Sequence, residues 1–178
     1  MVYVCLADGF EEMEAIVPID VMRRAGCEVV TVGVTGKMVT GNHGVTVKAD
    51  VTDFPPEEAE MIVLPGGSDG ADNLYASEMV TAAVTRCAQN GGKVAAICAA
   101  PYILGELGLL EGKRAVCYPS PLYESRLRGA VLSPGPVCTD GNITTGRSAG
   151  YSFDFGLELV RVLRGEAAAE SLRNSMVV

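Results

Sequence analysis

The stretch Val94-Ala-Ala-Ile-Cys98-Ala-Ala-Pro101 tells more about the fold than any other part of the chain. Its first four residues read as a short apolar strand, and Pro101 suits the first turn of a helix, where its missing N–H is not needed. A strand that passes directly into a helix places one residue on a sharp corner, and this corner tolerates only small neighbours two positions away. Ala96 and Ala100 meet that condition, so we expect Cys98 to occupy the corner.

The expected position of Cys98 has a chemical consequence. The N-terminus of a helix carries partial positive charge and unpaired N–H groups, and both favour a thiolate over a thiol. We therefore expect the pKa of Cys98 to lie below its ordinary value of about 8.5. The alternative is a buried core cysteine at the end of a strand, which is a common environment for free cysteine.

On both sides of this stretch, short β-branched runs alternate with helical segments, a pattern typical of a parallel sheet covered by helices on both faces. Strands are expected at 2–7, 28–34, 61–64 and 93–97, near Ala115 and near Val137, with an antiparallel excursion over 37–52 and a hairpin at 140–142. Helices are expected at 15–25, 72–89, 99–107, 152–163 and 166–175. Because proline inside a helix removes a backbone hydrogen bond, we expect the regular part of the first helix to begin near Pro18. No linker or repeat divides residues 1–178, which we expect to form one α/β domain.

Composition narrows the possible functions. The 178 residues are 48% hydrophobic and carry a net charge of −8, with no cluster of basic residues. This balance argues against nucleic-acid binding and against a polybasic membrane anchor. No apolar run approaches the roughly 20 residues that span a bilayer. The N-terminus lacks the basic start and cleavage site of a signal peptide, so we expect a cytoplasmic protein.

The cysteines give no sign of a metal centre. The chain has six of them, namely Cys5, Cys27, Cys87, Cys98, Cys117 and Cys138. None form a C-x-x-C pair, and their spacing matches no zinc pattern, so we expect free thiols in a reducing compartment. The sequence indicates neither a metal nor an organic cofactor.

Two further segments are expected near Cys98, because the carboxyl ends of parallel strands converge on one crevice. Pro65-Gly66-Gly67 follows a neighbouring strand, and the N–H groups of Gly66, Gly67 and Ala99 could form an oxyanion hole, although Gly-Gly is also an ordinary turn. Asp8 to Glu14 follows the first strand. Glu11 and Glu12 read as a solvated helix start, whereas Glu14 leads into an apolar run and is expected to point inward, with a raised pKa.

Several motifs together resemble one family over essentially the whole chain. They are Glu11-Glu-Met-Glu-Ala-Ile16, Pro18-Ile-Asp-Val-Met-Arg-Arg-Ala-Gly26, Leu64-Pro-Gly-Gly67, Ala95-Ala-Ile-Cys-Ala-Ala-Pro101 and Gly146-Arg-Ser-Ala-Gly-Tyr-Ser-Phe-Asp-Phe155. Their order and combination resemble the ThiJ/PfpI superfamily, in its Parkinson-disease protein deglycase branch. The resemblance implies a flavodoxin-like three-layer α/β/α sandwich with a mostly parallel central sheet, usually assembled as a homodimer.

The resemblance also implies roles for individual residues. Cys98 matches the family's nucleophile and Glu14 its carboxyl, while Gly67 and Ala99 match backbone donors. Arg147 matches an arginine near the pocket and the dimer contact, where the residues alone would suggest a solvated loop arginine. Gly150 belongs to the same motif.

One position departs from the family pattern. Many relatives place a histidine near the cysteine, where this chain has Tyr118, which would donate a hydrogen bond but not act as a base at neutral pH. The single histidine, His43, lies in an Asn-His-Gly turn and is expected to be exposed. The expected pair is therefore Cys98 with Glu14.

Three functions are compatible with these residues. The first is a cofactor-free glyoxalase or deglycase, which acts on small dicarbonyls such as methylglyoxal or on glycated substrates, with Cys98 as nucleophile and Glu14 as general acid and base. The second is a redox-sensing or protective protein, or a chaperone, that works through oxidation of Cys98. The third, a cysteine peptidase or amidotransferase, is disfavoured because no imidazole is placed to protonate an amine leaving group.

Overall fold

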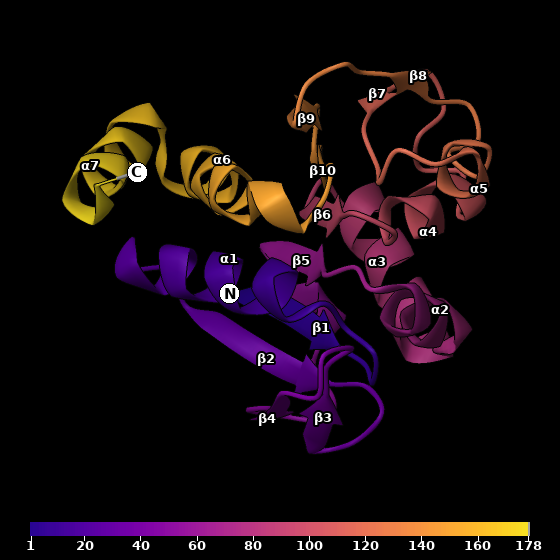
Figure 1. Cartoon of the computed structure of the whole chain (residues 1–178), viewed down its shortest axis with the longest axis horizontal. Helices are drawn as coiled ribbons and strands as arrows, with labels where there is room; N and C mark the ends of the chain where they lie inside the picture. The colour runs from indigo at the N-terminus through magenta and orange to yellow at the C-terminus, as the bar shows by residue number, and fades with distance from the viewer. Residues whose placement is uncertain (178) are drawn as a thin grey trace.

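A β-sheet with helices on both sides forms the centre of the protein (Figure 1). The sheet has six strands. A computed structural model describes residues 1–177. The strand order is β2-β1-β5-β6-β10-β9. The strands are β1 (Val2–Leu6), β2 (Val29–Gly33), β5 (Met61–Leu64), β6 (Lys93–Ile97), β9 (Val137–Asp140) and β10 (Ile143–Gly146). Only β9 runs antiparallel to its neighbour in this sheet, so the expected mostly parallel sheet is confirmed.

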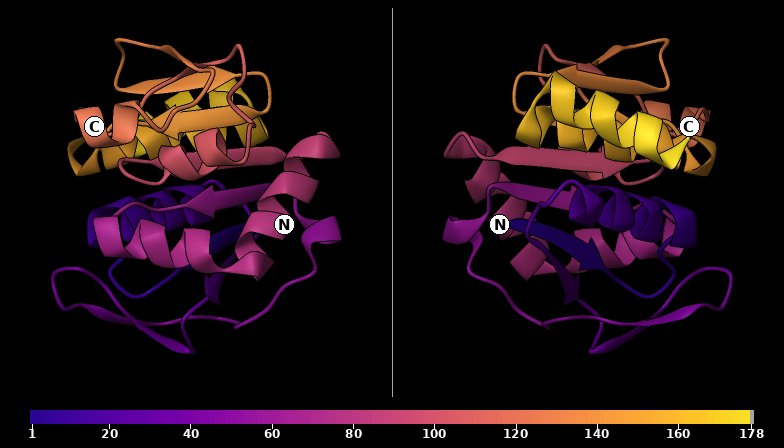
Figure 2. Two further views of the ribbon diagram at one scale, coloured as in Figure 1. Left: turned by 90° about the vertical axis from the view of Figure 1, so that its right-hand side faces the viewer. Right: turned by 90° about the vertical axis from the view of Figure 1, so that its left-hand side faces the viewer.

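Helices cover both faces of the sheet, which gives three layers (Figure 2). Helices α1 (Glu12–Arg24), α6 (Ser152–Arg164) and α7 (Glu166–Met176) cover one face. Helices α2 (Ser68–Ala76), α3 (Glu78–Gln89) and α4 (Pro101–Glu106) cover the other. Successive strand residues point to opposite faces, so Val4 packs in the first apolar layer and Cys5 in the second. The expected α/β/α sandwich is confirmed.

Smaller elements lie around these layers. β3 (Met38–Thr40) and β4 (Thr46–Lys48) form the expected antiparallel excursion, and the turn at 140–142 joins β9 to β10 as a hairpin. The remaining elements are β7 (Arg114–Ala115), β8 (Val131–Leu132), α5 (Pro121–Glu124) and the 3₁₀ turns Pro56–Glu58 and Ala149–Tyr151.

Helix α1 begins earlier than the sequence predicts. It starts at Glu12 and contains Pro18, so the expectation that the regular helix begins near Pro18 is wrong. The proline removes only the hydrogen bond that the carbonyl of Glu14 would otherwise accept. Two features offset this loss. Glu11 caps the helix by accepting a hydrogen bond from the backbone N–H of Glu14, and Pro18 packs closely against Gly156 of α6.

Two other helices also differ from expectation. The segment 72–89 is divided between α2 and α3, because Ser77 ends the first helix and caps the second by accepting a hydrogen bond from Val80 N–H. Helix α4 begins at Pro101 and spans six residues, shorter than the predicted 99–107. A turn at 98–100 therefore separates Cys98 from the start of the helix.

The parallel strands β1, β5, β6 and β10 end at one edge of the sheet, and the segments that follow them meet there. This edge brings together residues that are far apart in the sequence. Within residues 1–177, no helix combines the length and the apolar character that a bilayer crossing demands.

Candidate active site

A cavity of about 540 Å³ opens at the carboxyl edge of the sheet. Its walls come from the segments after β1, β5, β6, β7 and β10, from α5, and from the turn between β3 and β4. The lining residues are Glu11, Glu14, Asn42, His43, Gly67, Ser68, Cys98, Ala99, Tyr118, Tyr123, Ser148, Ala149 and Gly150. The sheet topology thus places Cys98 and Glu14 in one space, as the sequence predicts.

Cys98 stands on a strained corner. Its φ is +65°, and Val177 is the only other non-glycine residue with positive φ in the described part of the chain. L-residues avoid this region, and such strain persists only where the surrounding structure enforces it. Here the Cys98 N–H donates to the Gly146 carbonyl at 2.9 Å, and the Cys98 carbonyl accepts from Tyr118 N–H at 2.7 Å. The predicted strand-to-helix corner is confirmed.

The exposure of Cys98 also separates it from the other thiols. All six cysteines are free, and the other five are buried, whereas Cys98 is partly exposed to the cavity. A reagent that enters from solvent therefore meets Cys98 first. This excludes the alternative of a fully buried core cysteine.

Glu14 is a fully buried carboxyl in the first turn of α1. Its Oε2 accepts a hydrogen bond from the Gly66 N–H at 3.0 Å, while Oε1 is buried without a hydrogen-bond partner within residues 1–177. Burial raises the pKa of Glu14 to about 7, and the charge of Glu11 adds to this effect, while hydrogen bonding with Cys98 and Gly66 opposes it. The predicted inward carboxyl with a raised pKa is confirmed.

The predicted low pKa of Cys98 is wrong. Burial raises the pKa of the Cys98 thiol above its ordinary value, and the neighbouring Glu14 raises it further through its charge and hydrogen bonding. The backbone N–H groups of Ala99 and Gly67 lower the pKa but do not outweigh these effects. The expectation relied on a helix that starts at the cysteine, whereas α4 is short and begins three residues later. A charged Glu14 therefore opposes formation of a Cys98 thiolate, because its charge and hydrogen bonding raise the pKa of the thiol.

Gly66 and Gly67 fit the space around this pair. A Cβ at Gly66 would lie 2.5 Å from Glu14 Oε2 and 2.7 Å from Cys98 Cβ, so a side chain there would collide with both groups. Gly67 has a φ of +89° and approaches the Gly9 carbonyl closely. The N–H groups of Gly67 and Ala99 lower the pKa of Cys98 by hydrogen bonding to its sulfur, so they lie next to the atom to which a substrate carbonyl would bind. The N–H of Gly66 does not join them as expected, because it donates to Glu14 Oε2.

Of the other expected site residues, Tyr118 and Gly150 line the cavity but Arg147 does not. Arg147 lines a separate cavity of about 220 Å³ beside Cys117, and its Nη1 donates to the Pro134 carbonyl at 3.3 Å.

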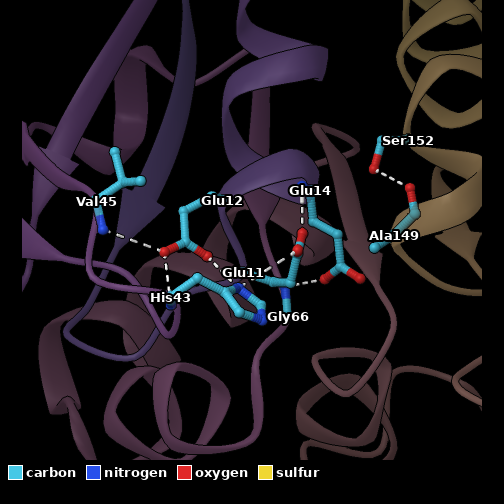
Figure 3. Close-up of polar contacts among 8 residues, drawn as sticks. All are labelled: Glu11, Glu12, Glu14, His43, Val45, Gly66, Ala149 and Ser152. Carbon is cyan, nitrogen blue, oxygen red and sulfur yellow. Dashed lines mark hydrogen bonds and ion pairs between the residues drawn. The ribbon is translucent and has the colours of Figure 1, made fainter.

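Glu11, Glu12 and His43 form a polar group (Figure 3). Glu11 and the exposed His43 line the mouth of the cavity, and Glu12 lies beside His43 without lining it. His43 Nδ1 lies 2.8 Å from Glu12 Oε2, and Glu12 Oε1 accepts hydrogen bonds from the backbone N–H groups of His43 at 2.6 Å and Val45 at 3.4 Å. Glu11 and Glu12 are therefore not simply solvated, contrary to expectation. His43 is exposed as predicted, but it also lines the cavity.

One potential ligand atom from each of Glu11, Glu12 and His43 lies within 4.8 Å of the others, which is close enough for one cation to reach all three. The structure instead uses these atoms for hydrogen bonds. Nδ1 of His43 faces Glu12, and Glu11 Oε2 accepts the Glu14 N–H at 2.8 Å as the helix cap.

Sequence reasoning missed part of the cavity wall. Ser68 and Tyr123 face each other across 2.7 Å between their hydroxyl oxygens, and both line the cavity, as do Asn42 and Ser148. Ser68, Tyr123 and Asn42 lie in different loops and helices, and no local motif marks these three. Only Ser148 had a signal, because it follows Arg147 in the motif at 146–155.

These features define a class of protein: an α/β sandwich with a cysteine on a strand-to-helix corner and a buried carboxyl beside it. Over residues 1–162 the chain matches the DJ-1/PfpI family, and it belongs to that family. The resemblance inferred from the motifs is confirmed.

Individual relatives match along most of their length. The chain is 32% identical over 178 residues to Protein dj-1beta of Drosophila melanogaster, and the match covers 98% of this chain and 95% of the fly protein. It is 31% identical over 165 residues to Deglycase TK1284 of Thermococcus kodakarensis, with 92% and 99% covered. The solved structure of oxidized Toxoplasma gondii DJ-1 superposes with a TM-score of 0.91 at 33% identity, over 99% of this chain and 97% of that one.

Proposed function

We propose that the chain is a cofactor-free, cysteine-dependent enzyme that converts reactive dicarbonyls such as methylglyoxal to hydroxy acids such as lactate. The observation that carries this proposal is the pairing of Cys98, strained and partly exposed, with a buried Glu14 whose pKa of about 7 lets it both accept and donate protons. A related protein is named a deglycase, which supports chemistry at such carbonyls.

The first step is addition of sulfur to the aldehyde. The Glu14 carboxylate takes the thiol proton while the sulfur of Cys98 forms a bond to the aldehyde carbon. The electron pair of the carbonyl moves to oxygen, which the N–H groups of Gly67 and Ala99 stabilise. Glu14 then returns its proton to that oxygen, which leaves a neutral hemithioacetal and a carboxylate ready for the next step.

The second step moves hydrogen between two carbon atoms. Glu14 removes the proton from the carbon bonded to sulfur, and the electron pair passes through an enediol to the adjacent carbon, which then receives the proton. The product is the thioester of lactate on Cys98. Water hydrolyses this thioester, so that one methylglyoxal and one water give one lactic acid and restore the thiol. One carbon is oxidised and its neighbour reduced, so the reaction balances without an external oxidant.

The raised pKa values of Cys98 and Glu14 suit this series of reaction steps. A thiol that loses its proton only when an aldehyde is present stays largely uncharged at rest, and Glu14 is the acceptor within reach. The expected thiolate at rest is not needed, because proton transfer and attack occur together.

The test measures lactate formed from methylglyoxal by the wild type, Cys98→Ser and Glu14→Gln. We expect both variants to lose at least about 10²-fold in kcat, since each removes a group that takes part in every step. Glu28→Gln is the matched control, because Glu28 is exposed and lies outside the cavity. Equal rates in all four proteins would refute the proposal.

A second function, oxidative sensing or protection, has its own supporting observation. Cys98 is the only partly exposed cysteine among the described residues, and a protonated Glu14 Oε1 has no other partner and could donate to an oxidised sulfur. The solved Toxoplasma relative is described as oxidized. Two peroxide molecules would convert the thiol to a sulfinic acid with release of two waters. Mass spectrometry after mild peroxide should find two added oxygens at Cys98 alone; equal oxidation of the buried cysteines would refute it.

We also propose a homodimer in the reducing cytoplasm. Met13 and Ile16 of α1 and Tyr151 and Phe153 at the start of α6 are large, apolar and exposed. Helices α1 and α6 pack against each other, so these side chains are presented by neighbouring elements. An exposed apolar surface of this kind suits contact with a second copy.

A further inference from the structure

The Glu12–His43 pair at the cavity mouth is unused by the mechanism above. We infer that His43 is a further catalytic residue, whose Nε2 donates a proton to the second carbonyl oxygen of the dicarbonyl substrate and later recovers a proton from the intermediate. This inference rests on the proposed function and extends it to the carbon that the Cys98–Glu14 pair does not activate.

The ring of His43 has a fixed orientation. Glu12 Oε1 accepts hydrogen bonds from the backbone N–H groups of His43 and Val45. Glu12 Oε2 lies 2.8 Å from Nδ1 of the His43 ring. Gly41 makes room for this carboxylate, because a Cβ there would lie 2.5 Å from Glu12 Oε1. With Nδ1 directed at Glu12, Nε2 is the nitrogen left free for another partner. The His43 side chain lines the same cavity as Cys98.

The Glu12 carboxylate also affects the protonation and the tautomer of the His43 ring. The hydrogen bond with Glu12 raises the pKa of His43, and the charges of Glu12 and Glu11 act in the same direction. The pKa of Glu12 is lowered, because hydrogen bonds from His43 and Val45 outweigh the effect of burial. In the neutral ring, Glu12 keeps the proton on Nδ1, so Nε2 is either a proton donor in imidazolium or a base in imidazole.

The composition of the cavity wall singles out His43 for this role. The lining residues include no lysine and no arginine. His43 is thus the only lining side chain that can carry positive charge, whereas the enediol step builds negative charge on the second oxygen. The hydroxyl of Tyr123 is hydrogen-bonded with that of Ser68 at 2.7 Å, so Tyr118 is the competing phenol in the cavity wall.

The proton movements balance. As Glu14 removes the proton from the carbon bonded to sulfur, the electron pair flows to the second oxygen, and His43 imidazolium protonates that oxygen to give a neutral enediol. Glu14 then protonates the second carbon. The hydroxyl on the first carbon loses its proton to the neutral His43 ring and becomes the thioester carbonyl. His43 ends as an imidazolium, as it began, and its Nδ1 stays hydrogen-bonded to Glu12 throughout.

The test distinguishes the enediol step, in which His43 would act, from the reaction of Cys98 as a nucleophile. His43→Gln should lower kcat for methylglyoxal by about 10²-fold, the scale of lost general-acid catalysis, with a smaller change in KM. The rate at which iodoacetamide alkylates Cys98 should stay within about twofold of the wild type, because Cys98 is paired with Glu14. His43 is exposed, so this variant should fold normally, and a chelator in the assay removes adventitious metal.

The pH dependence of kcat distinguishes a catalytic role of His43 from a structural one, because a structural role would leave it unchanged. In the wild type, kcat should fall on the acid side as Glu14 is protonated and on the alkaline side as His43 loses its proton. Glu12→Gln replaces the carboxylate, whose hydrogen bond and charge raise the pKa of His43, with a neutral amide, so the alkaline limb should move to lower pH. His43→Gln should abolish that limb.

Each outcome decides the question. If the wild type makes no more lactate than Cys98→Ser, the proposed function fails and His43 has no such reaction to serve. If the wild type is active and His43→Gln keeps its kcat and its alkaline limb, the assignment of His43 is overturned while the proposed function stands. A large loss in Tyr118→Phe with none in His43→Gln would transfer the role to Tyr118.

Discussion

Replacing Glu14 by glutamine should remove activity and stabilise the fold at neutral and alkaline pH. Burial raises the pKa of Glu14 from 4.5 to about 7. The folded protein therefore holds this proton more tightly than the unfolded chain does. Stability from this group is fully present below pH 4.5 and is lost as the pH rises toward 7. A difference of about 2.5 pKa units corresponds to about 3 kcal/mol, since each unit is worth about 1.4 kcal/mol.

Glutamine avoids this loss because it has no charge to bury. Its amide oxygen can accept the Gly66 N–H, and its amide nitrogen would occupy the position of the unpartnered Oε1. Above pH 8, Glu14→Gln should therefore be more stable than the wild type by up to about 3 kcal/mol. At pH 4, where Glu14 is protonated in both states, the difference should nearly vanish.

Urea unfolding between pH 4 and 8, followed by circular dichroism, measures these free energies. Glu28→Gln is the control, because its carboxylate is exposed in the folded protein and should leave the pH dependence of the wild type unchanged. Parallel stability curves for the wild type and Glu14→Gln across this range would refute the assignment of Glu14 as a buried, proton-sharing carboxyl.

Two other substitutions test the surroundings of the site and the proposed dimer. Gly66→Ala should reduce the rate of Cys98 alkylation and destabilise the fold by about 1–3 kcal/mol, because the new Cβ would lie 2.5 Å from Glu14 Oε2; unchanged urea midpoint and alkylation rate would contradict this. Ile16→Glu should convert a dimer to a monomer in light scattering, while Leu122→Glu, at a more exposed apolar residue of α5, should not. Identical masses for both variants would rule out α1 as the interface.

Much of the fold was predictable because it depends on local patterns. The strands Met61–Leu64 and Lys93–Ile97 have the bounds expected from their apolar runs. The helix boundaries were less predictable. Pro18 lies inside α1 because a helix cap and contact with α6 offset its lost hydrogen bond, and only packing could show this. Ser77 divides one expected helix by capping the next.

The sequence alone determined that Cys98 stands on a corner, since small neighbours at Ala96 and Ala100 are a local steric requirement, and that Glu14 faces the core. Only the tertiary structure decided the protonation of the pair. Burial raises the pKa of Cys98 where the sequence predicted a decrease, because desolvation depends on what surrounds the sulfur and not on the residues next to it. The tertiary structure likewise brought His43 to the cavity mouth, through a carboxylate 31 residues earlier in the chain.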